Sequence, residues 1–264
     1  MKTDDLRAAV RILRNSIQLQ LKNNLVSGEI AGTLILQPVI FTLISVGTYV
    51  YGHKPDLGLF AITGTGLISI WNGNLFTSGD ILRDERRRGT LSLVMASPTS
   101  LPFVLLGKSF ANAILSSLAM GITFLTGMLA FRLPIGIADP LAFLAGLLLV
   151  IFSITCLGLV FGSLFMVTRT AGEFVAVANF PVYILSGLSV PLTLLPLWTR
   201  PLSELLSPTW GNRALIAAAT GSGGSMLPNY LVIVALSLLY LWIARLLYRR
   251  VESLALKAGT LEQW

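Results

Sequence analysis

Six long apolar stretches constrain this chain more than any other feature of its sequence. A helix needs about 20 apolar residues to cross the hydrocarbon core of a bilayer. Stretches of this size lie at residues 30–51, 57–78, 102–131, 141–166, 174–197 and 230–248. Only 12% of the residues are charged, about half the share in a typical soluble domain. The sequence therefore predicts an all-α integral membrane protein with six transmembrane helices.

The distribution of Lys and Arg predicts how these spans are oriented. Basic residues are enriched in the cytoplasmic loops of membrane proteins. If the N-terminus is cytoplasmic, all of the 19 Lys and Arg residues face the cytoplasm except Lys54, Arg132, Arg200 and Arg213. Both termini are therefore predicted to be cytoplasmic. This topology and anionic lipid headgroups explain the net charge of +7, so no nucleic-acid partner is expected.

The segment before the first span, residues 1–28, is expected to form an amphipathic helix. Its apolar residues recur at steps of three and four, at Leu6, Val10, Leu13, Ile17 and Leu21. A stripe of mainly basic residues runs beside them. A helix with this pattern is typical of one that lies along a membrane surface, and packing against another protein is compatible with the same pattern.

The segment 83–98, between the second and third spans, concentrates charge in a chain that has little. It begins with Arg83, Asp84, Glu85, Arg86, Arg87 and Arg88. It continues through Gly89, Thr90, Leu91, Leu93, Val94 and Met95 to Ser97 and Pro98. The apolar run is too short to cross a bilayer and stops at a proline. It predicts a short cytoplasmic helix parallel to the membrane, suited to binding another protein.

This segment resembles the cytoplasmic loop of type-2 ABC exporter permeases. The family pattern is an acidic residue, Gly-Thr, Leu, and then Ser-Pro or Thr-Pro before the third span. The matching residues are Glu85, Gly89, Thr90, Leu93, Ser97 and Pro98, whereas Ser92 stands where many members carry a Glu. A second match lies in 185–198, at Ser186, Gly187, Pro191 and Pro196. The overall layout is similar over nearly the whole chain.

The resemblance implies a single permease domain, residues 1–264, in the inner membrane of a bacterium. Within it, 1–28 is the interfacial helix, 79–101 the cytoplasmic coupling segment and 187–228 a long outer loop with short re-entrant helices. The implied partners are two soluble ABC ATPase subunits, a second six-span permease, identical or related, and membrane lipids. Residues 83–98 would form the interface that couples the permease to the ATPase subunits.

No residue pattern indicates a catalytic, cofactor or metal site on this chain. The nearest match to a phosphate-binding loop is Gly-Lys-Ser at 107–109, but Pro102 stands where such a loop requires a glycine. Cys156 and His53 are the only residues of their kinds. We therefore expect ATP and Mg to be bound by the partner subunits, which would carry out the hydrolysis.

Polar residues within the spans predict where a cargo would pass. Such residues tend to face the interior of a bundle or a cavity, and the candidates are Gln37, Asn72, Asn74, Asn112 and Asn179. Interhelical hydrogen bonding is the alternative role for each of them. In the family, the second and fifth spans line the pathway. This favours Asn72, Asn179, Phe180 and Tyr183 as path or gate residues.

The aliphatic spans favour an amphiphilic or lipophilic cargo, such as a drug, a lipid or a peptide-like molecule. Export of a polysaccharide or glycolipid by the same family is the alternative. An ion-coupled secondary transporter also fits the number of spans, but ion coupling usually needs an acidic residue deep in the membrane, and these spans carry none away from their ends. A membrane-embedded enzyme fits less well, because no nucleophile and base are paired in the sequence.

Overall fold

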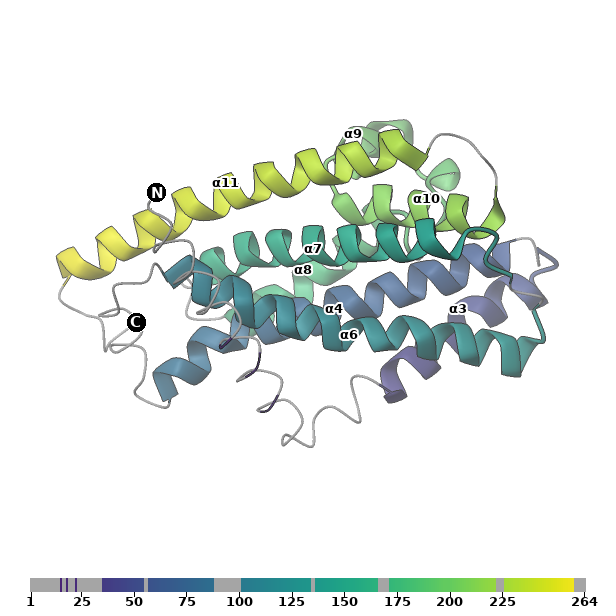
Figure 1. The fold of residues 1–264 in the computed structure, drawn as a ribbon, viewed down its shortest axis with the longest axis horizontal. Coiled ribbons are helices and arrows are strands. Elements are labelled where there is room, and N and C mark those ends of the chain that lie inside the picture. The colour runs from purple at the N-terminus through teal and green to yellow at the C-terminus, as the bar shows by residue number, and fades with distance from the viewer. Residues whose placement is uncertain are drawn as a thin grey trace.

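A computed structural model describes residues 15, 18, 22, 35–54, 57–87, 101–133, 136–165, 171–221 and 226–258. All regular elements in these residues are helices, which confirms the all-α prediction for this part of the chain. The longest are α4 (Gly58–Arg87), α6 (Leu101–Phe131), α7 (Pro140–Phe165) and α11 (Met226–Ala258). They run along the long axis of the molecule, together with the shorter α3 (Gln37–Tyr51) and α8 (Ala171–Leu185) (Figure 1).

Three helical stretches in the described residues are long and apolar enough to cross a membrane. They are Ile114–Phe131, Pro140–Ser163 and Met226–Arg250, and they correspond to the third, fourth and sixth expected spans. The helices α3 and α8 have 15 residues each, fewer than the roughly 20 that a span requires. The full set of six spans and the orientation of the termini stay predictions.

The fifth expected span, 174–197, was predicted too long. The helix α8 ends at Leu185, and Gly187 has a left-handed backbone with φ of 67°. The chain then forms the 3-10 helices η3 (Leu192–Leu194) and η4 (Leu197–Thr199), followed by α9 (Arg200–Glu204). Apolar composition continues to residue 197, but a helix cannot pass through a left-handed glycine.

The helix α10 (Ser207–Thr220) is continuous over 14 residues, whereas the sequence predicted only short re-entrant helices within 187–228. Pro208 lies in its first turn, where the missing N–H costs no hydrogen bond. Gly211 lets the helix approach α7, because a Cβ there would be 2.4 Å from Cγ2 of Val150. Gly221, with φ of 63°, ends the helix.

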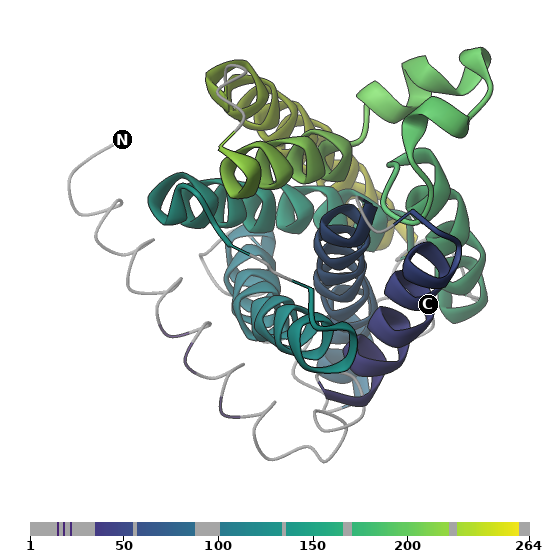
Figure 2. The same ribbon diagram turned by 90° about the vertical axis from the view of Figure 1, so that its right-hand side faces the viewer.

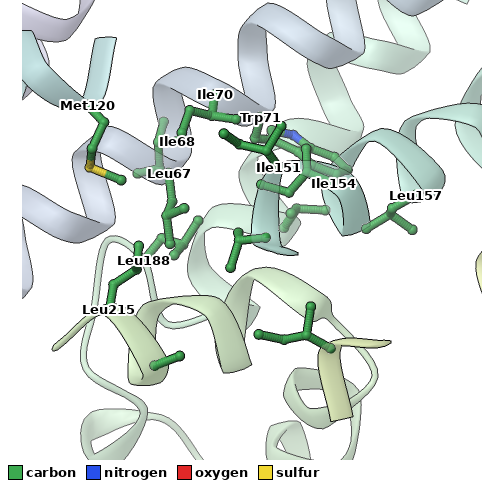
Figure 3. Close-up of a cluster of buried hydrophobic side chains, with 14 of the residues drawn as sticks. Leu67, Ile68, Ile70, Trp71, Met120, Ile151, Ile154, Leu157, Leu188 and Leu215 are labelled. Atoms are coloured by element: carbon green, nitrogen blue, oxygen red, sulfur yellow. The ribbon is translucent and has the colours of Figure 1, made fainter. Parts of the chain in front are cut away.

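The central helix of the bundle is α4. It contacts α3, α6, α7, α8 and α10, and the view along the long axis shows these helices around it (Figure 2). Every residue from 61 to 72 is buried. Leu67 and Trp71 of α4 pack in the core with Ile151 and Ile154 of α7 and with Leu188, from the turn after α8 (Figure 3). This burial places the polar residues of α4 inside the protein.

Candidate functional site

Two side-chain hydrogen bonds join α4 to α8 inside the bundle. Nε1 of Trp71 donates to Oδ1 of Asn179 at 2.9 Å, and the hydroxyl of Tyr183 donates to Oδ1 of Asn72. Asn72, Asn179 and Tyr183 are exposed by only 4%, 5% and 9%. Residues four apart on α8 can meet neighbouring residues of α4 because positions i and i+4 share one helix face. These four residues are called the α4–α8 seam below.

The seam brings together three of the residues predicted to line a transport path. Asn72, Asn179 and Tyr183 each bond to the opposite helix, and for the two asparagines this is the alternative role that the sequence left open. Phe180 lies outside the seam. Its side chain is 68% exposed, and its ring meets that of Tyr183 edge-on at 6.2 Å. A role of these residues in transport stays a prediction.

Asn74 faces a different neighbour from Asn72, as expected for two residues that are two positions apart on a helix. Nδ2 of Asn74 donates to Oγ1 of Thr155 on α7 at 3.3 Å. Gly158, one turn further along α7, faces the same side chain, because a Cβ there would be in ordinary van der Waals contact with Oδ1 of Asn74, at 3.4 Å. Asn72 and Asn74 therefore join α4 to opposite neighbours, α8 and α7.

A polar contact that the sequence pattern did not predict holds α10 against α4. The hydroxyl of Thr63 donates to Oδ1 of Asn212 at 2.8 Å, and Nδ2 of Asn212 donates to the carbonyl oxygen of Gly187 at 3.3 Å. Asn212 is 3% exposed. Its signal in the sequence was an amide near the apolar run Ala-Leu-Ile-Ala-Ala-Ala, but that run lies in the loop 187–228, where only short re-entrant helices were expected.

The turn after α8, residues 186–189, lies tightly against its neighbours. A Cβ at Gly64 would be 2.1 Å from the carbonyl oxygen of Leu188, and a Cβ at Gly187 would be 2.7 Å from Cγ of Leu192. The hydroxyl of Tyr49, on α3, donates to the carbonyl oxygen of Ser189 at 2.9 Å. The glycine of the Ser-Gly motif fits this turn for two reasons: the backbone of Gly187 has a positive φ, and a Cβ there would clash with Leu192.

Most of the predicted coupling segment lies outside the described residues. The backbone of α4 continues without a break to Arg87, so its last turns contain Arg83, Asp84, Glu85, Arg86 and Arg87, whose side chains are not described. The remainder, residues 88–98, lies outside the described part, as does most of the interfacial helix 1–28. Asn15, Gln18 and Lys22 of that helix are helical and exposed.

The described residues contain no group of three or more His, Cys, Asp or Glu side chains that could hold a metal ion. The Gly-Lys-Ser match at 107–109 lies inside the continuous helix α6, whereas a phosphate-binding loop needs a glycine-rich loop that leads into a helix. Lys108, at the centre of the match, is 6% exposed. This geometry does not fit a nucleotide site.

Comparison with known proteins agrees with the resemblance seen in the sequence. A family model described as ABC-2 type transporter matches residues 9–219. The match includes the α4–α8 seam, the coupling segment and the turn after α8. A search of curated proteins found no match to this chain.

Proposed function

The chain belongs to the ABC-2 type transporter family, and from this we propose that it is one permease half of an exporter driven by separate ATPase subunits. Family membership makes the chain a membrane permease that functions in transport. The proposal adds an outward direction, an amphiphilic or lipophilic cargo and two soluble ATPase subunits that bind ATP and Mg. It also adds a second permease, identical or related, as the other half.

The continuity of α4 is the observation that carries this proposal. Its 30 residues make a rod about 45 Å long. Part of the rod is buried and bonded to α8 through Trp71 and Asn72. The rod ends at Arg87, inside the predicted coupling segment. No flexible linker separates the two parts, so a displacement of the charged end would reach the α4–α8 seam.

The mechanism follows from this connection. ATP binding would draw the two ATPase subunits together, and their movement would be passed to the coupling segment. Leu91, Leu93, Val94 and Met95 would form its apolar contact with the ATPase. The charged residues at 83–88 would set orientation through complementary charge more than through affinity.

The α4–α8 seam would then open to admit the cargo. Opening would expose the amides of Asn72 and Asn179 and the hydroxyl of Tyr183 beside the exposed ring of Phe180. A surface that combines polar groups with an aromatic ring suits a molecule with both polar and apolar parts. This supports an amphiphilic cargo for the proposed exporter.

Co-purification of the chain with its ATPase subunit in detergent tests the coupling role. A variant combining Gly89→Pro with Leu93→Asp is expected to lose the ATPase, because proline disrupts the short helix and a carboxylate is costly in an apolar contact. The matched control is Leu194→Asp, which places the same charge on a 65% exposed side chain of η3. The subunit ratio in the wild-type complex also distinguishes a homodimer from a heterodimer of permeases.

Two results would contradict the proposal in different ways. If the double variant retains as much ATPase as wild type does, residues 83–98 are not the coupling element. If wild type retains no ATPase in any detergent or nanodisc, ATP-driven export is contradicted, and ion-coupled transport is the next function to test.

A further inference from the structure

Basic residues at the ends of α3 and α6 adopt an unusual backbone conformation. Among the described residues other than glycine, only His53 and Arg132 have a left-handed backbone, with φ of 58° and 50°. Gly187 and Gly221 adopt the same conformation, where a glycine meets no steric penalty. A residue with a Cβ is strained there. Glycine would therefore be favoured at 53 and 132 unless the His and Arg side chains contribute to stability or to binding and so offset the strain.

These residues lie on neighbouring helices at the same end of the molecule (Figure 1). The rings of Tyr51 and Phe131, next to the two helix ends, meet edge-on with centroids 6.3 Å apart. The side chains of His53, Lys54 and Arg132 are all exposed. Within the described part of the chain, none of them pairs with an acidic side chain. The three residues are called the basic rim below.

Apolar side chains cover the exposed faces of the same helices toward the middle of the bundle. On α6, Leu125 and Leu129 are 56% and 73% exposed, and their spacing of four places them on one face. On α3, Ile44 is 63% exposed. Positive groups above an apolar surface match the chemistry of a phospholipid, whose phosphate lies above its acyl chains.

We propose that the basic rim binds the phosphate of an anionic phospholipid whose acyl chains lie along the exposed faces of α3 and α6. The site depends on the membrane location of the chain and not on its cargo or its ATPase. The loops after α3 and α6 also carry Asp56 and Asp139. Oδ1 of Asp139 accepts a hydrogen bond from the backbone N–H of Ala142 at the start of α7. The charges of Lys54 and Arg132 exceed that of Asp56 by one. Lipid binding would then offset the strain at His53 and Arg132.

Basic residues at the C-terminal ends of helices can also interact favourably with the helix dipole. That role would stabilise the protein with or without lipid, and it would not distinguish one lipid from another. Lipid binding and the dipole therefore predict different results when lipid is added to variants of the rim.

Lipid titration of the purified full-length chain in detergent tests the site. The probe is phosphatidylglycerol, compared with phosphatidylcholine of the same acyl chains and with inorganic phosphate. Thermal stability and lipid retention in native mass spectrometry are measured. Arg132→Gln is expected to weaken phosphatidylglycerol binding about fivefold, equivalent to about 1 kcal/mol for one basic side chain at an anionic surface. The matched control, Arg200→Gln, removes an exposed charge from α9 and should change binding by less than about twofold.

Arg132→Gly separates the two roles. It is expected to raise the melting temperature in lipid-free detergent, because glycine relieves the left-handed strain, and to weaken phosphatidylglycerol binding as Arg132→Gln does. Equal loss of binding in Arg200→Gln would overturn the proposal. So would equal stabilisation by inorganic phosphate or phosphatidylcholine. A lower melting temperature of Arg132→Gly with unchanged lipid binding would assign Arg132 to the helix dipole instead.

Discussion

At the residue scale, Gly64 marks the place where α4 and the turn after α8 come into backbone contact. Gly64→Ala would put a Cβ 2.1 Å from the carbonyl oxygen of Leu188. Since a backbone atom cannot rotate away as a side chain can, the variant should lose about 1–3 kcal/mol of stability through overpacking. Thermal unfolding in detergent measures the change.

The control for this prediction is Gly121→Ala on α6. A Cβ at Gly121 would meet nothing within 4 Å, and alanine is favoured over glycine inside a helix by about 1 kcal/mol. Gly121→Ala should therefore leave the melting temperature unchanged or raise it. Equal melting temperatures for the two variants would show that the turn does not press on α4 as described.

The asparagines show what a single residue reveals about its surroundings. Asn72, Asn74, Asn112 and Asn179 were all recognised as polar residues in apolar stretches, and all four are buried, with exposures of 4%, 0%, 2% and 5%. A polar group in an apolar stretch predicts burial because it is costly in contact with lipid. The pattern does not reveal which group the buried asparagine bonds to. Asn212 was not predicted, because the segment around it was not recognised as one helix.

At the scale of elements, substitutions of two aromatic residues of α8 are expected to have different effects, because Tyr183 lies inside the α4–α8 seam and Phe180 lies outside it. Tyr183→Phe removes the hydroxyl that bonds Asn72, and it should lower the stability by about 0.5–2 kcal/mol. Phe180→Ala should leave stability nearly unchanged, because its side chain is 68% exposed, but it should alter the ATPase activity stimulated by cargo. Melting temperature and ATPase activity in the reconstituted complex measure the two effects.

Val177→Ala is the matched control on α8, since Val177 is 70% exposed. It should change neither stability nor stimulated activity. If Val177→Ala and Phe180→Ala change the activity equally, the effect belongs to the exposed face of α8 in general and not to the aromatic ring. If neither changes it, Phe180 does not line the path.

Helix boundaries were predicted well where apolarity and backbone conformation agree. The third and fourth spans were expected at 102–131 and 141–166, and the helices are Leu101–Phe131 and Pro140–Phe165. The fifth was expected to continue to residue 197 but ends at Leu185. Hydropathy measures only the preference of side chains for lipid. It therefore could not predict that the left-handed backbone at Gly187 ends the helix.

At the scale of the whole molecule, the C-terminal ends of the described helices lie at two opposite ends of the bundle. The C-terminal ends of α3 and α6 lie at one end of the bundle, near the C-terminal end of α10, and the C-terminal ends of α4 and α11 lie at the other (Figure 1). If the termini are cytoplasmic, Lys54 lies on the outer side of the membrane and Arg249 lies on the cytoplasmic side. Both side chains are exposed, so both positions can be labelled.

Cysteine labelling in intact cells measures this orientation. In a Cys156→Ala background, which removes the buried thiol, Lys54→Cys should react with a membrane-impermeant maleimide in intact cells. Arg249→Cys should react only after the cells are made permeable. The reverse pattern would place the termini outside and contradict the assignment based on Lys and Arg.

The sequence by itself determined the environment, the class of fold and the family of this protein. Apolar content, the placement of basic residues and short ordered motifs are properties of residues along the chain, and they need no tertiary information. They were enough to predict an all-α membrane protein and to point to the ABC-2 type transporter family, which the match over residues 9–219 supports.

Only the tertiary structure decided which polar groups meet. Trp71 and Asn179 are 108 residues apart in the chain, Asn72 and Tyr183 are 111 apart, and Thr63 and Asn212 are 149 apart. Local periodicity can assign a residue to a helix face, but it cannot determine which helix packs against that face. That choice depends on how all the helices pack around α4, where close approach at glycines and hydrogen bonds between buried side chains must be satisfied together.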